Sequence, residues 1–250
     1  SEYLWIADPG SKRAGVPEYA PKQGPGQVLK LTFDGEVVQT LARPDLPIYE
    51  SGKYSPTAVA VAEERLGGNG DIWVADGYGM SYVHRFDKGG RYLGSINGQE
   101  GDAGPFKTPH GVAIDWRKAE PELLVADRTN HRIQVYDLEG NWKRVVGESF
   151  LSSPSVFAFD GDNLVVGELR ARLAILDRDD RLVGYIGGNE SVCDEPGWPN
   201  QKSAAGHPER TERLRPGKFN SPHGLAADAD GNLYVAEWLI GGRYTKLVKR

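Results

Sequence analysis

The stretch Ser55-Pro56-Thr57-Ala58-Val59-Ala60-Val61 recurs with small changes at three later places in the chain. The related stretches are Thr108-Pro109-His110-Gly111-Val112-Ala113-Ile114, Ser153-Pro154-Ser155-Val156-Phe157-Ala158-Phe159 and Ser221-Pro222-His223-Gly224-Leu225-Ala226-Ala227. Each has a Ser-Pro or Thr-Pro turn signal before a short apolar run, which predicts a turn followed by a β-strand. Because self-similarity along a chain marks a repeat architecture, we expect copies of one small β unit.

A second apolar run follows each of these stretches and ends in a small residue and an acid. The four runs are Ile72-Trp73-Val74-Ala75-Asp76, Leu123-Leu124-Val125-Ala126-Asp127, Leu164-Val165-Val166-Gly167-Glu168 and Leu233-Tyr234-Val235-Ala236-Glu237. Short continuous apolar runs predict fully buried strands. The recurring acids, among them Asp8, Asp76 and Asp127, are expected to be structural and to accept hydrogen bonds from turn amides.

The third strand of each unit alternates polar and apolar residues, as in Val83-His84-Arg85-Phe86-Asp87, and a turn leads from it to a fourth strand. Such alternation predicts a strand with one buried face and one solvent-exposed face. The amino terminus enters this template at a second strand, Leu4-Trp5-Ile6-Ala7-Asp8, and the carboxyl terminus leaves it at a third, Thr245-Lys246-Leu247-Val248-Lys249. The predicted fold is therefore all-β, a β-propeller of four-stranded blades with five repeats visible.

Five closed blades, and six blades of which part is missing at the amino terminus, both fit this pattern. Because a bare blade takes ~40 to 45 residues, the excess length must lie in loops, chiefly in residues 9–26 and 189–218. We expect residues 1–250 to form one domain, with these insertions on the face where binding occurs. If five blades close, Leu4 and Leu247 should lie in adjacent or shared blades.

Composition narrows the classes of function. The net charge of −5 comes from interspersed charges of both signs, which disfavours binding to nucleic acid. The single cysteine, Cys193, excludes an internal disulfide and a zinc site with several cysteines. No apolar run approaches the ~20 residues of a membrane span. The first residue is Ser1, so an upstream segment is expected to have been removed or left out.

Several motifs carry a resemblance to a known family. The tract Val74-Ala75-Asp76-Gly77-Tyr78-Gly79-Met80-Ser81 is followed by Thr108-Pro109-His110-Gly111, Val125-Ala126-Asp127-Arg128-Thr129-Asn130-His131-Arg132-Ile133-Gln134 and Ser221-Pro222-His223-Gly224. In motifs and in order this series resembles the peptidyl-α-hydroxyglycine α-amidating lyases, and the blades resemble NHL repeats. The similarity runs from about Leu4 to Val248.

The resemblance implies a zinc-dependent lyase that splits a peptidyl or amide-linked α-hydroxyglycine into an amide and glyoxylate. By motif, His110 and His223 correspond to zinc ligands, Tyr78 to the catalytic base and Arg128 to an active-site arginine. The family's first Pro-His motif would lie before Ser1, and Ser221 and Gly224 stand where the family has a methionine and an acid. Zinc is the expected cofactor, with calcium as a structural candidate, and a secreted or periplasmic location is favoured.

The residues also support part of this reading without the family. His110 and His223 occupy equivalent positions in two blades, directly after a proline and before the innermost strand. Propeller symmetry would aim both at the central channel, where their imidazoles could share a zinc ion. A tyrosine is a base only as its phenolate, which a cation such as Arg128 would favour at Tyr78. Gly77 and Gly79 would let the chain turn sharply and present the phenol.

Each of these residues also has a structural alternative. Pro-His-Gly can be a packing motif, Tyr78 an ordinary aromatic that caps a turn, and Arg128 a partner of Asp127 or of a neighbouring blade. His84, His131 and His207 are predicted to be surface residues, and Cys193 a loop thiol.

The alternative function is a non-catalytic NHL propeller that binds a peptide or protein on its loop face. A sugar-lactone hydrolase would need an acidic calcium site, for which the sequence shows no suitable cluster. We expect a monomer with a small-molecule or peptide substrate at the central channel.

Overall fold

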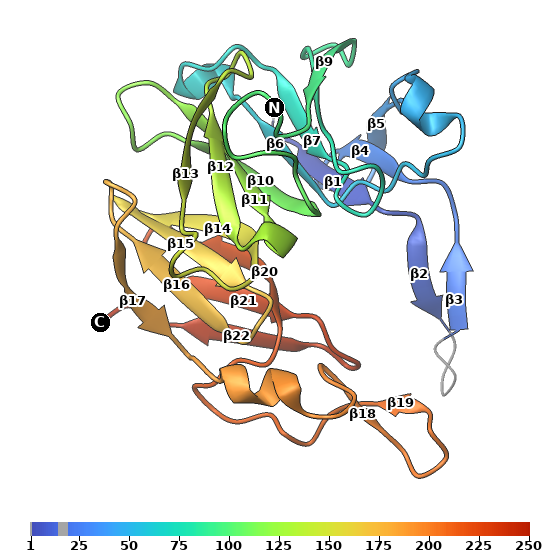
Figure 1. Cartoon of the computed structure of the whole chain (residues 1–250), viewed down its shortest axis with the longest axis vertical. Helices are drawn as coiled ribbons and strands as arrows, with labels where there is room; N and C mark the ends of the chain where they lie inside the picture. Colours follow the sequence, from blue (N-terminus) through green and yellow to red (C-terminus); the bar gives the residue numbers. More distant parts are fainter. Residues whose placement is uncertain (1, 15–19) are drawn as a thin grey trace. The chain divides into compact units, whose positions relative to one another are not determined.

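The structure is a computed structural model that describes residues 2–14 and 20–250. It confirms the all-β class, because strands, turns and short 3-10 helices make up the described residues. Five antiparallel sheets carry the predicted repeat, and we call them blades 1 to 5 (Figure 1). None of the described helices is long and apolar enough to cross a membrane.

The strands follow the predicted order within each blade. Blade 1 contains β1 (Leu4–Asp8), β4 (Gln27–Leu31) and β5 (Val37–Leu41), and blade 2 contains β6 (Ala58–Val61), β7 (Ile72–Ala75), β8 (Val83–Phe86) and β9 (Tyr92–Ile96). Blade 3 contains β10 (Pro109–Asp115), β11 (Glu122–Asp127), β12 (Arg132–Tyr136) and β13 (Trp142–Val146). Blade 4 contains β14 (Pro154–Asp160), β15 (Asn163–Glu168), β16 (Arg172–Leu176) and β17 (Leu182–Ile186). Blade 5 contains β20 (Pro222–Ala227), β21 (Leu233–Glu237) and β22 (Arg243–Leu247).

The chain divides into two compact units, which are described separately. The first comprises residues 1–12 and 21–148, with blades 1 to 3, and the second comprises residues 13–20 and 149–250, with blades 4 and 5. A single domain over 1–250 stays a prediction, and so does the placing of Leu4 near Leu247, because the two residues belong to different units.

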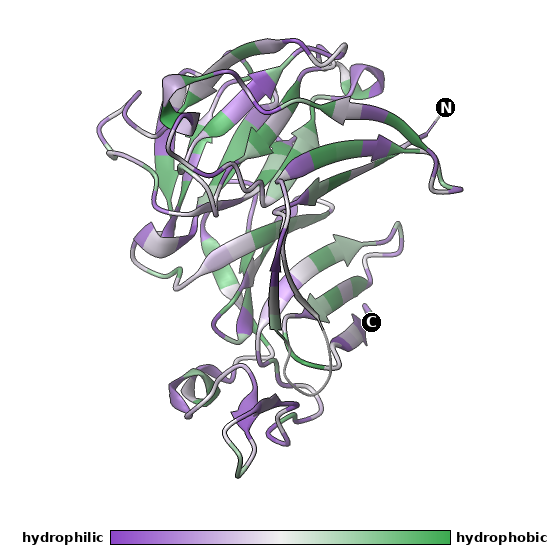
Figure 2. Ribbon diagram, turned by 90° about the vertical axis from the view of Figure 1, so that its right-hand side faces the viewer, coloured by the Kyte–Doolittle hydropathy of each residue, from purple (hydrophilic) through white to green (hydrophobic). Residues whose placement is uncertain are grey.

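The core of the first unit lies between its blades. Both faces of β7 and β11 are buried, as their continuous apolar runs predict. Trp73 of blade 2 belongs to one apolar cluster with Val112 and Leu123 of blade 3, while Val28 of blade 1 packs in a second cluster with Ile72. Figure 2 shows the apolar residues concentrated in strands. Apolar side chains buried between neighbouring blades therefore hold in place the strand ends next to the predicted site residues.

The second unit follows the same scheme. Val165 and Leu173 of blade 4 pack with Leu233 and Val235 of blade 5 in one cluster. The outer strand β17 is largely exposed, whereas β15 is buried over most of its length. The same repeat therefore forms a core in each unit separately.

Short elements occupy the connections. The predicted insertion 9–26 carries the hairpin of β2 (Ser11–Ala14) and β3 (Ala20–Gln23), with residues 15–19 outside the described part. The insertion 189–218 carries η4 (Glu190–Asp194) and the hairpin of β18 (Gln201–Lys202) and β19 (Pro208–Glu209). The remaining 3-10 helices are η1 (Pro47–Tyr49), η2 (Glu64–Leu66) and η3 (Arg128–Asn130). That the two insertions share a binding face stays a prediction.

Each blade with a complete acid motif is clamped by that acid. The carboxylate accepts backbone N–H groups from the segment just before the innermost strand: Ser55 to Asp76, Lys107 to Asp127, Ser153 to Glu168 and Ser221 to Glu237. The acids are buried, so these bonds satisfy amides that water cannot reach. This agrees with the structural role expected from the sequence, and we call these four residues the clamp acids.

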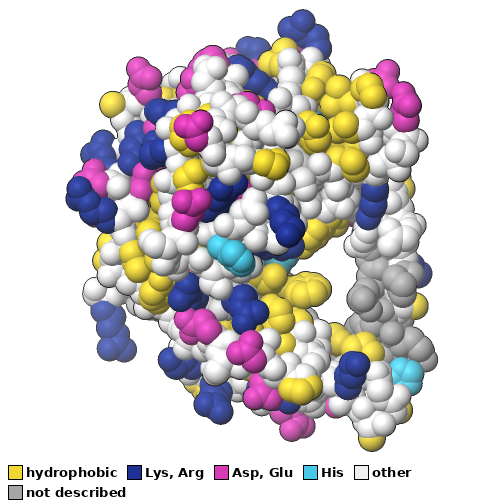
Figure 3. All heavy atoms as spheres, viewed as in Figure 1, with side chains coloured by type: hydrophobic (Ala, Val, Ile, Leu, Met, Phe, Trp, Pro, Cys, Tyr) yellow, Lys and Arg dark blue, Asp and Glu magenta, His cyan; other side chains and the backbone are white. Residues whose placement is uncertain are grey.

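Charged side chains of both signs are interspersed on the surface drawn in Figure 3. This pattern agrees with the mixed charge distribution of the sequence.

Candidate functional site

The first unit brings together three of the four predicted site residues. The hydroxyl oxygen of Tyr78 lies 3.1 Å from Nε2 of His110. Nη1 of Arg128 donates to the same hydroxyl at 3.3 Å, and its guanidinium carbon lies 5.3 Å from the centre of the Tyr78 ring. Tyr78 is 43% exposed whereas His110 is 4% exposed, so an accessible phenol rests on a buried imidazole.

Tyr78 and Arg128 occupy the same backbone position in successive blades. The N–H of Tyr78 donates to the carbonyl of Ser55, and the N–H of Arg128 donates to the carbonyl of Thr108, the equivalent residue before proline. The corresponding residues of blades 4 and 5 are Leu169, bonded to Ser153, and Trp238, bonded to Ser221. We call this position the slot. Sequence reasoning missed Trp238, although its place directly after the clamp acid Glu237 was a usable signal.

Tyr78 reaches the slot because blade 2 has one extra residue, Gly77, after its clamp acid. A Cβ added to Gly77 would lie 2.3 Å from the carbonyl oxygen of Pro109 and 2.8 Å from Oγ1 of Thr57. Glycine is thus required by close approach to the strand that carries His110, and not by a left-handed turn, since Gly77 is absent from the described positive-φ glycines. The sequence analysis expected Gly77 to permit a sharp turn, whereas the structure gives close packing against Pro109 as the reason for glycine here.

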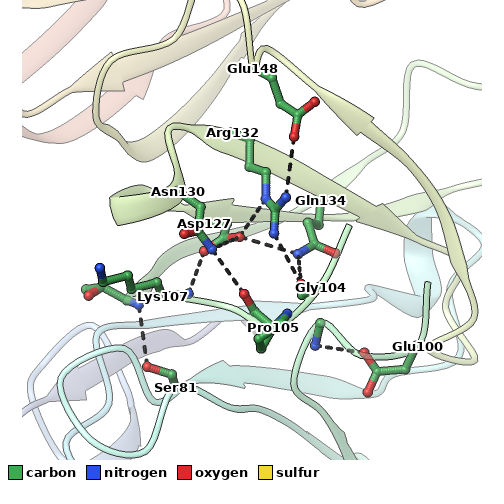
Figure 4. Close-up of polar contacts among 12 residues, drawn as sticks. Ser81, Glu100, Gly104, Pro105, Lys107, Asp127, Asn130, Arg132, Gln134 and Glu148 are labelled. Atoms are coloured by element: carbon green, nitrogen blue, oxygen red, sulfur yellow. Dashed lines mark hydrogen bonds and ion pairs between the residues drawn. The ribbon is translucent and has the colours of Figure 1, made fainter. Parts of the chain in front are cut away.

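Arg128 is available to Tyr78 because the clamp acid beside it has other partners. Asp127 accepts from Nε of Arg132 at 2.8 Å and from Nδ2 of Asn130 at 2.9 Å, and Figure 4 shows both contacts. Gln134 also reaches Oδ2 of Asp127, at 3.3 Å. The alternative that Arg128 is a partner of a neighbouring blade agrees with its contact to Tyr78.

The fourth predicted residue, His223, lies in the second unit at the start of β20. The centre of its ring is 6.2 Å from the ring centre of Trp238, which is 54% exposed. Because His110 and His223 belong to different units, their shared zinc site stays a prediction. Within residues 2–14 and 20–250, no group of three or more histidines, cysteines or acids is placed to hold a metal ion.

One prediction about the other histidines was wrong, and the predicted loop thiol is buried. His84, expected at the surface, is fully buried in blade 2, and burial lowers its pKa to about 4. It lies on the same face of β8 as buried Phe86, a spacing that could have revealed this. Cys193 lies in η4 and is 9% exposed, and burial raises the pKa of its thiol to about 11. His131 and His207 are exposed, as predicted.

Comparison with known proteins identifies the repeat. The NHL repeat family model matches residues 106–136, a span that includes His110 and Arg128. The chain contains an NHL repeat and is a β-propeller. Among solved structures, this NHL-repeat propeller is similar to the virginiamycin B lyase of Staphylococcus aureus, with a TM-score of 0.54 and 12% identity, covering 99% of this chain and 74% of that one. A nidogen/laminin complex gives a TM-score of 0.55 at 16% identity, covering 85% of this chain and 64% of that one. These two likenesses bear on the fold alone.

Curated relatives carry the names that the sequence motifs suggested. A probable peptidyl-alpha-hydroxyglycine alpha-amidating lyase of Caenorhabditis elegans is 28% identical over 240 residues, covering 93% of this propeller and 57% of that protein. A lyase of the same name from Drosophila melanogaster is 28% identical over 253 residues, covering 94% of this propeller and 40% of that protein. The human NHL repeat-containing protein 3 is 30% identical over 187 residues, with 69% and 48% covered. The propeller thus spans about half the length of these relatives.

Proposed function

We propose that the chain is a lyase-like enzyme that splits a peptidyl or amide-linked α-hydroxyglycine into an amide and glyoxylate. The observation that carries the proposal is the position of the Tyr78 hydroxyl, within hydrogen-bonding distance of both His110 and Arg128. The names of the two curated lyases supply the substrate class.

The proposed reaction needs one group that first takes a proton and later gives it back. Tyr78, as its phenolate, would remove the proton of the substrate hydroxyl. The oxygen electrons would then form the C=O bond of glyoxylate as the carbon–nitrogen bond breaks. The amide nitrogen would recover the proton from Tyr78. Arg128 would favour the phenolate as an adjacent cation, and His110 would hold the phenol in place.

Zinc belongs to this proposal because of the sequence resemblance. His110 and His223 would be its ligands in this chain, and a bound zinc ion would acidify a substrate hydroxyl attached to it. The described residues do not gather the three protein ligands typical of a catalytic zinc site. The proton steps above are therefore assigned to Tyr78 and its neighbours alone.

The deciding experiment measures glyoxylate release from a synthetic peptidyl α-hydroxyglycine by the purified protein, with metal content determined on the same sample. Release of glyoxylate and amide in equal amounts supports the proposal, and a zinc content near one per chain supports the metal assignment. A folded protein that leaves such substrates untouched rules the lyase out. In that case the chain is a binding propeller, and peptide binding to its loop face becomes the function to measure. The expected monomeric state and secreted or periplasmic location also remain proposals.

A further inference from the structure

The clamp acid of blade 2 differs from the other three in its side-chain partner. Asp127, Glu168 and Glu237 are each paired with an arginine of the following strand: Arg132, Arg172 and Arg243. In blade 2 the hydroxyl of Tyr49 donates to Oδ2 of Asp76 at 2.6 Å instead. This is also the blade whose loop presents Tyr78.

Asp76 stands at the start of that loop, and its two oxygens bond one residue within the loop and one residue of the segment before β6. Oδ1 accepts from the N–H of Ser55 at 2.6 Å, and Oδ2 accepts from the N–H of Met80 at 2.7 Å. Ser55 in turn accepts the N–H of Tyr78 through its carbonyl. The carboxylate of Asp76 therefore adds to the backbone bonds that join Asp76 to Gly79, Ser81 and Tyr82 across the loop.

Behind Asp76 lies a chain of hydrogen bonds that is buried at Tyr49 and His84 and part-buried beyond them. The Tyr49 hydroxyl is 2.7 Å from Nε2 of His84, Nδ1 of His84 is 2.7 Å from Oγ of Ser95, and that oxygen is 2.7 Å from the hydroxyl of Tyr92. Tyr49 and His84 are buried. No arginine takes part in this chain.

The direction of every bond in the chain follows from the first bond together with a neutral His84 ring. Tyr49 has one proton and gives it to Asp76, so Nε2 of His84 must be the donor to Tyr49. Nδ1 of His84 then accepts from Ser95, and Ser95 accepts from Tyr92. This arrangement fits a neutral imidazole, which agrees with the lowered pKa of His84. Burial raises the pKa of Tyr49, and the Asp76 carboxylate raises it further, so the hydroxyl keeps its proton.

We propose that Tyr49 and His84 are positioning residues: through Asp76 they hold the loop that places Tyr78 against His110 and Arg128. All donors in the chain point toward Asp76, and donors aligned in this way strengthen one another. The hydrogen bonds to the carboxylate thus come from neutral groups in blade 2, where blades 3 to 5 use a guanidinium. The assignment of Tyr78 as the base rests on the proposed function, but the positioning of its loop does not.

The neighbouring Tyr54 offers a matched control. It packs edge-on against Tyr49 with ring centres 5.6 Å apart, and its buried hydroxyl has no hydrogen-bond partner among the described residues. Tyr54→Phe therefore makes the same chemical change in the same cluster without removing a bond to Asp76. Tyr49→Phe removes the donor to the carboxylate and leaves the ring in place.

Amide hydrogen exchange tests the positioning without any assay of activity. In Tyr49→Phe the segment 76–82 should exchange about tenfold faster or more, because Asp76 loses the charge-assisted hydrogen bond that holds its carboxylate in place to accept from Met80. The β11 segment 122–127 should be unchanged, and Tyr54→Phe should exchange like the wild type. Ser95→Ala, which breaks the chain of bonds beyond His84, should give a smaller change in the same direction and serves if Tyr49→Phe does not fold.

Kinetics then connect the loop to the proposed reaction. On a peptidyl α-hydroxyglycine, Tyr49→Phe should lower kcat by ~10- to 100-fold with KM nearly unchanged, since a small misplacement of a reacting group costs rate rather than binding. Unchanged exchange in 76–82, or equal effects of Tyr49→Phe and Tyr54→Phe on exchange, overturns the positioning role. A wild-type protein without lyase activity overturns the proposed function only, because the exchange result still decides the positioning.

Discussion

Gly77 lies against the carbonyl of Pro109 so closely that a Cβ would come within 2.3 Å of the oxygen. Thr57 strengthens this junction, because its hydroxyl donates to the same carbonyl at 3.2 Å. The loop of Tyr78 and the strand of His110 are therefore packed backbone to backbone across two blades. A side chain at position 77 would have to push them apart.

Gly77→Ala should lower the free energy of unfolding by ~1 to 3 kcal/mol, the usual cost of overpacking a tight contact. Urea denaturation of the variant and the wild type measures this. Gly94→Ala is the control in the same blade, because a Cβ there has no atom within 4 Å. Equal stability of the two variants would show that the junction between Gly77 and Pro109 is looser than described.

Tyr78→Phe should reduce turnover of a peptidyl α-hydroxyglycine by ~10²- to 10⁴-fold, the contribution of a general base. Stability and metal content should stay close to those of the wild type, because Tyr78 is 43% exposed. Glyoxylate release, far-UV circular dichroism and metal analysis of both proteins check this. Full activity in the variant would remove Tyr78 from the proposed mechanism.

Arg128→Gln should lower the same turnover by ~10²- to 10³-fold, comparable with the loss of one preorganised donor to a developing anion. The variant keeps a polar side chain but no cation beside Tyr78. Arg91→Gln is the control, since Arg91 is 79% exposed and pairs with Asp87 at a hairpin turn. If both variants keep wild-type rates, Arg128 has no part in the reaction.

The lowered pKa of the buried His84 predicts that the protein loses stability in acid. Burial lowers its pKa to about 4 in the folded protein, whereas an unfolded histidine titrates near ~6.5. The unfolded state therefore binds the extra proton first, and stability falls as the pH drops from ~6.5 toward ~4, by roughly 3 kcal/mol at the lower end. Stability should not depend on His84 in this way above pH ~7.

His84→Gln separates this effect from that of the carboxylates, which titrate in both proteins. The variant should be less stable than the wild type at neutral pH, because it loses buried hydrogen bonds. The difference between the two, measured by urea denaturation, should shrink as the pH falls. A difference that stays constant from pH 7 to pH 4.5 would contradict the lowered pKa.

The burial of Cys193 predicts that its thiol reacts slowly in the native protein. It packs with Val192, Ala171 and Trp198, and burial raises its pKa to about 11. A thiol-specific reagent at neutral pH should therefore react more than ~100-fold faster after denaturation than in the native protein. The reagent should label one thiol per chain, because the sequence contains one cysteine. Rapid labelling of the native protein would mean that η4 opens readily.

The sequence was sufficient for the blades and for part of the site. The recurring Pro-containing starts and acid-terminated runs predicted the order of the strands within blades 2 to 5, since each blade is a local unit whose strands are adjacent in the chain. The hairpin of β18 and β19 was not predicted. The encounter of Tyr78, His110 and Arg128 followed from equivalent loops of neighbouring blades. The hydrogen-bond partner of His84 could not be predicted in the same way, because Tyr49 comes from a 3-10 helix outside the repeat.

Loops also limited the prediction of the hydrogen bonds behind the site. The contact between Tyr49 and Asp76 joins residues 27 positions apart, and nothing in the spacing of either residue indicates it. The reason that Gly77 is glycine was likewise out of reach, because it depends on a carbonyl in the next blade. Local patterns predict strands well, whereas single contacts between loops depend on tertiary packing.

The clamp acids have a consequence for how such a chain can diverge. Each clamp is made by a carboxylate and backbone amides, so the residue in the slot beside it takes no part through its side chain. Tyr78, Arg128, Leu169 and Trp238 share one backbone hydrogen bond and have four different chemistries. Mutation can thus change the identity of a slot residue while the scaffold around it is inherited intact. A repeat that is conservative in its backbone is, at this one position per blade, open to new functions.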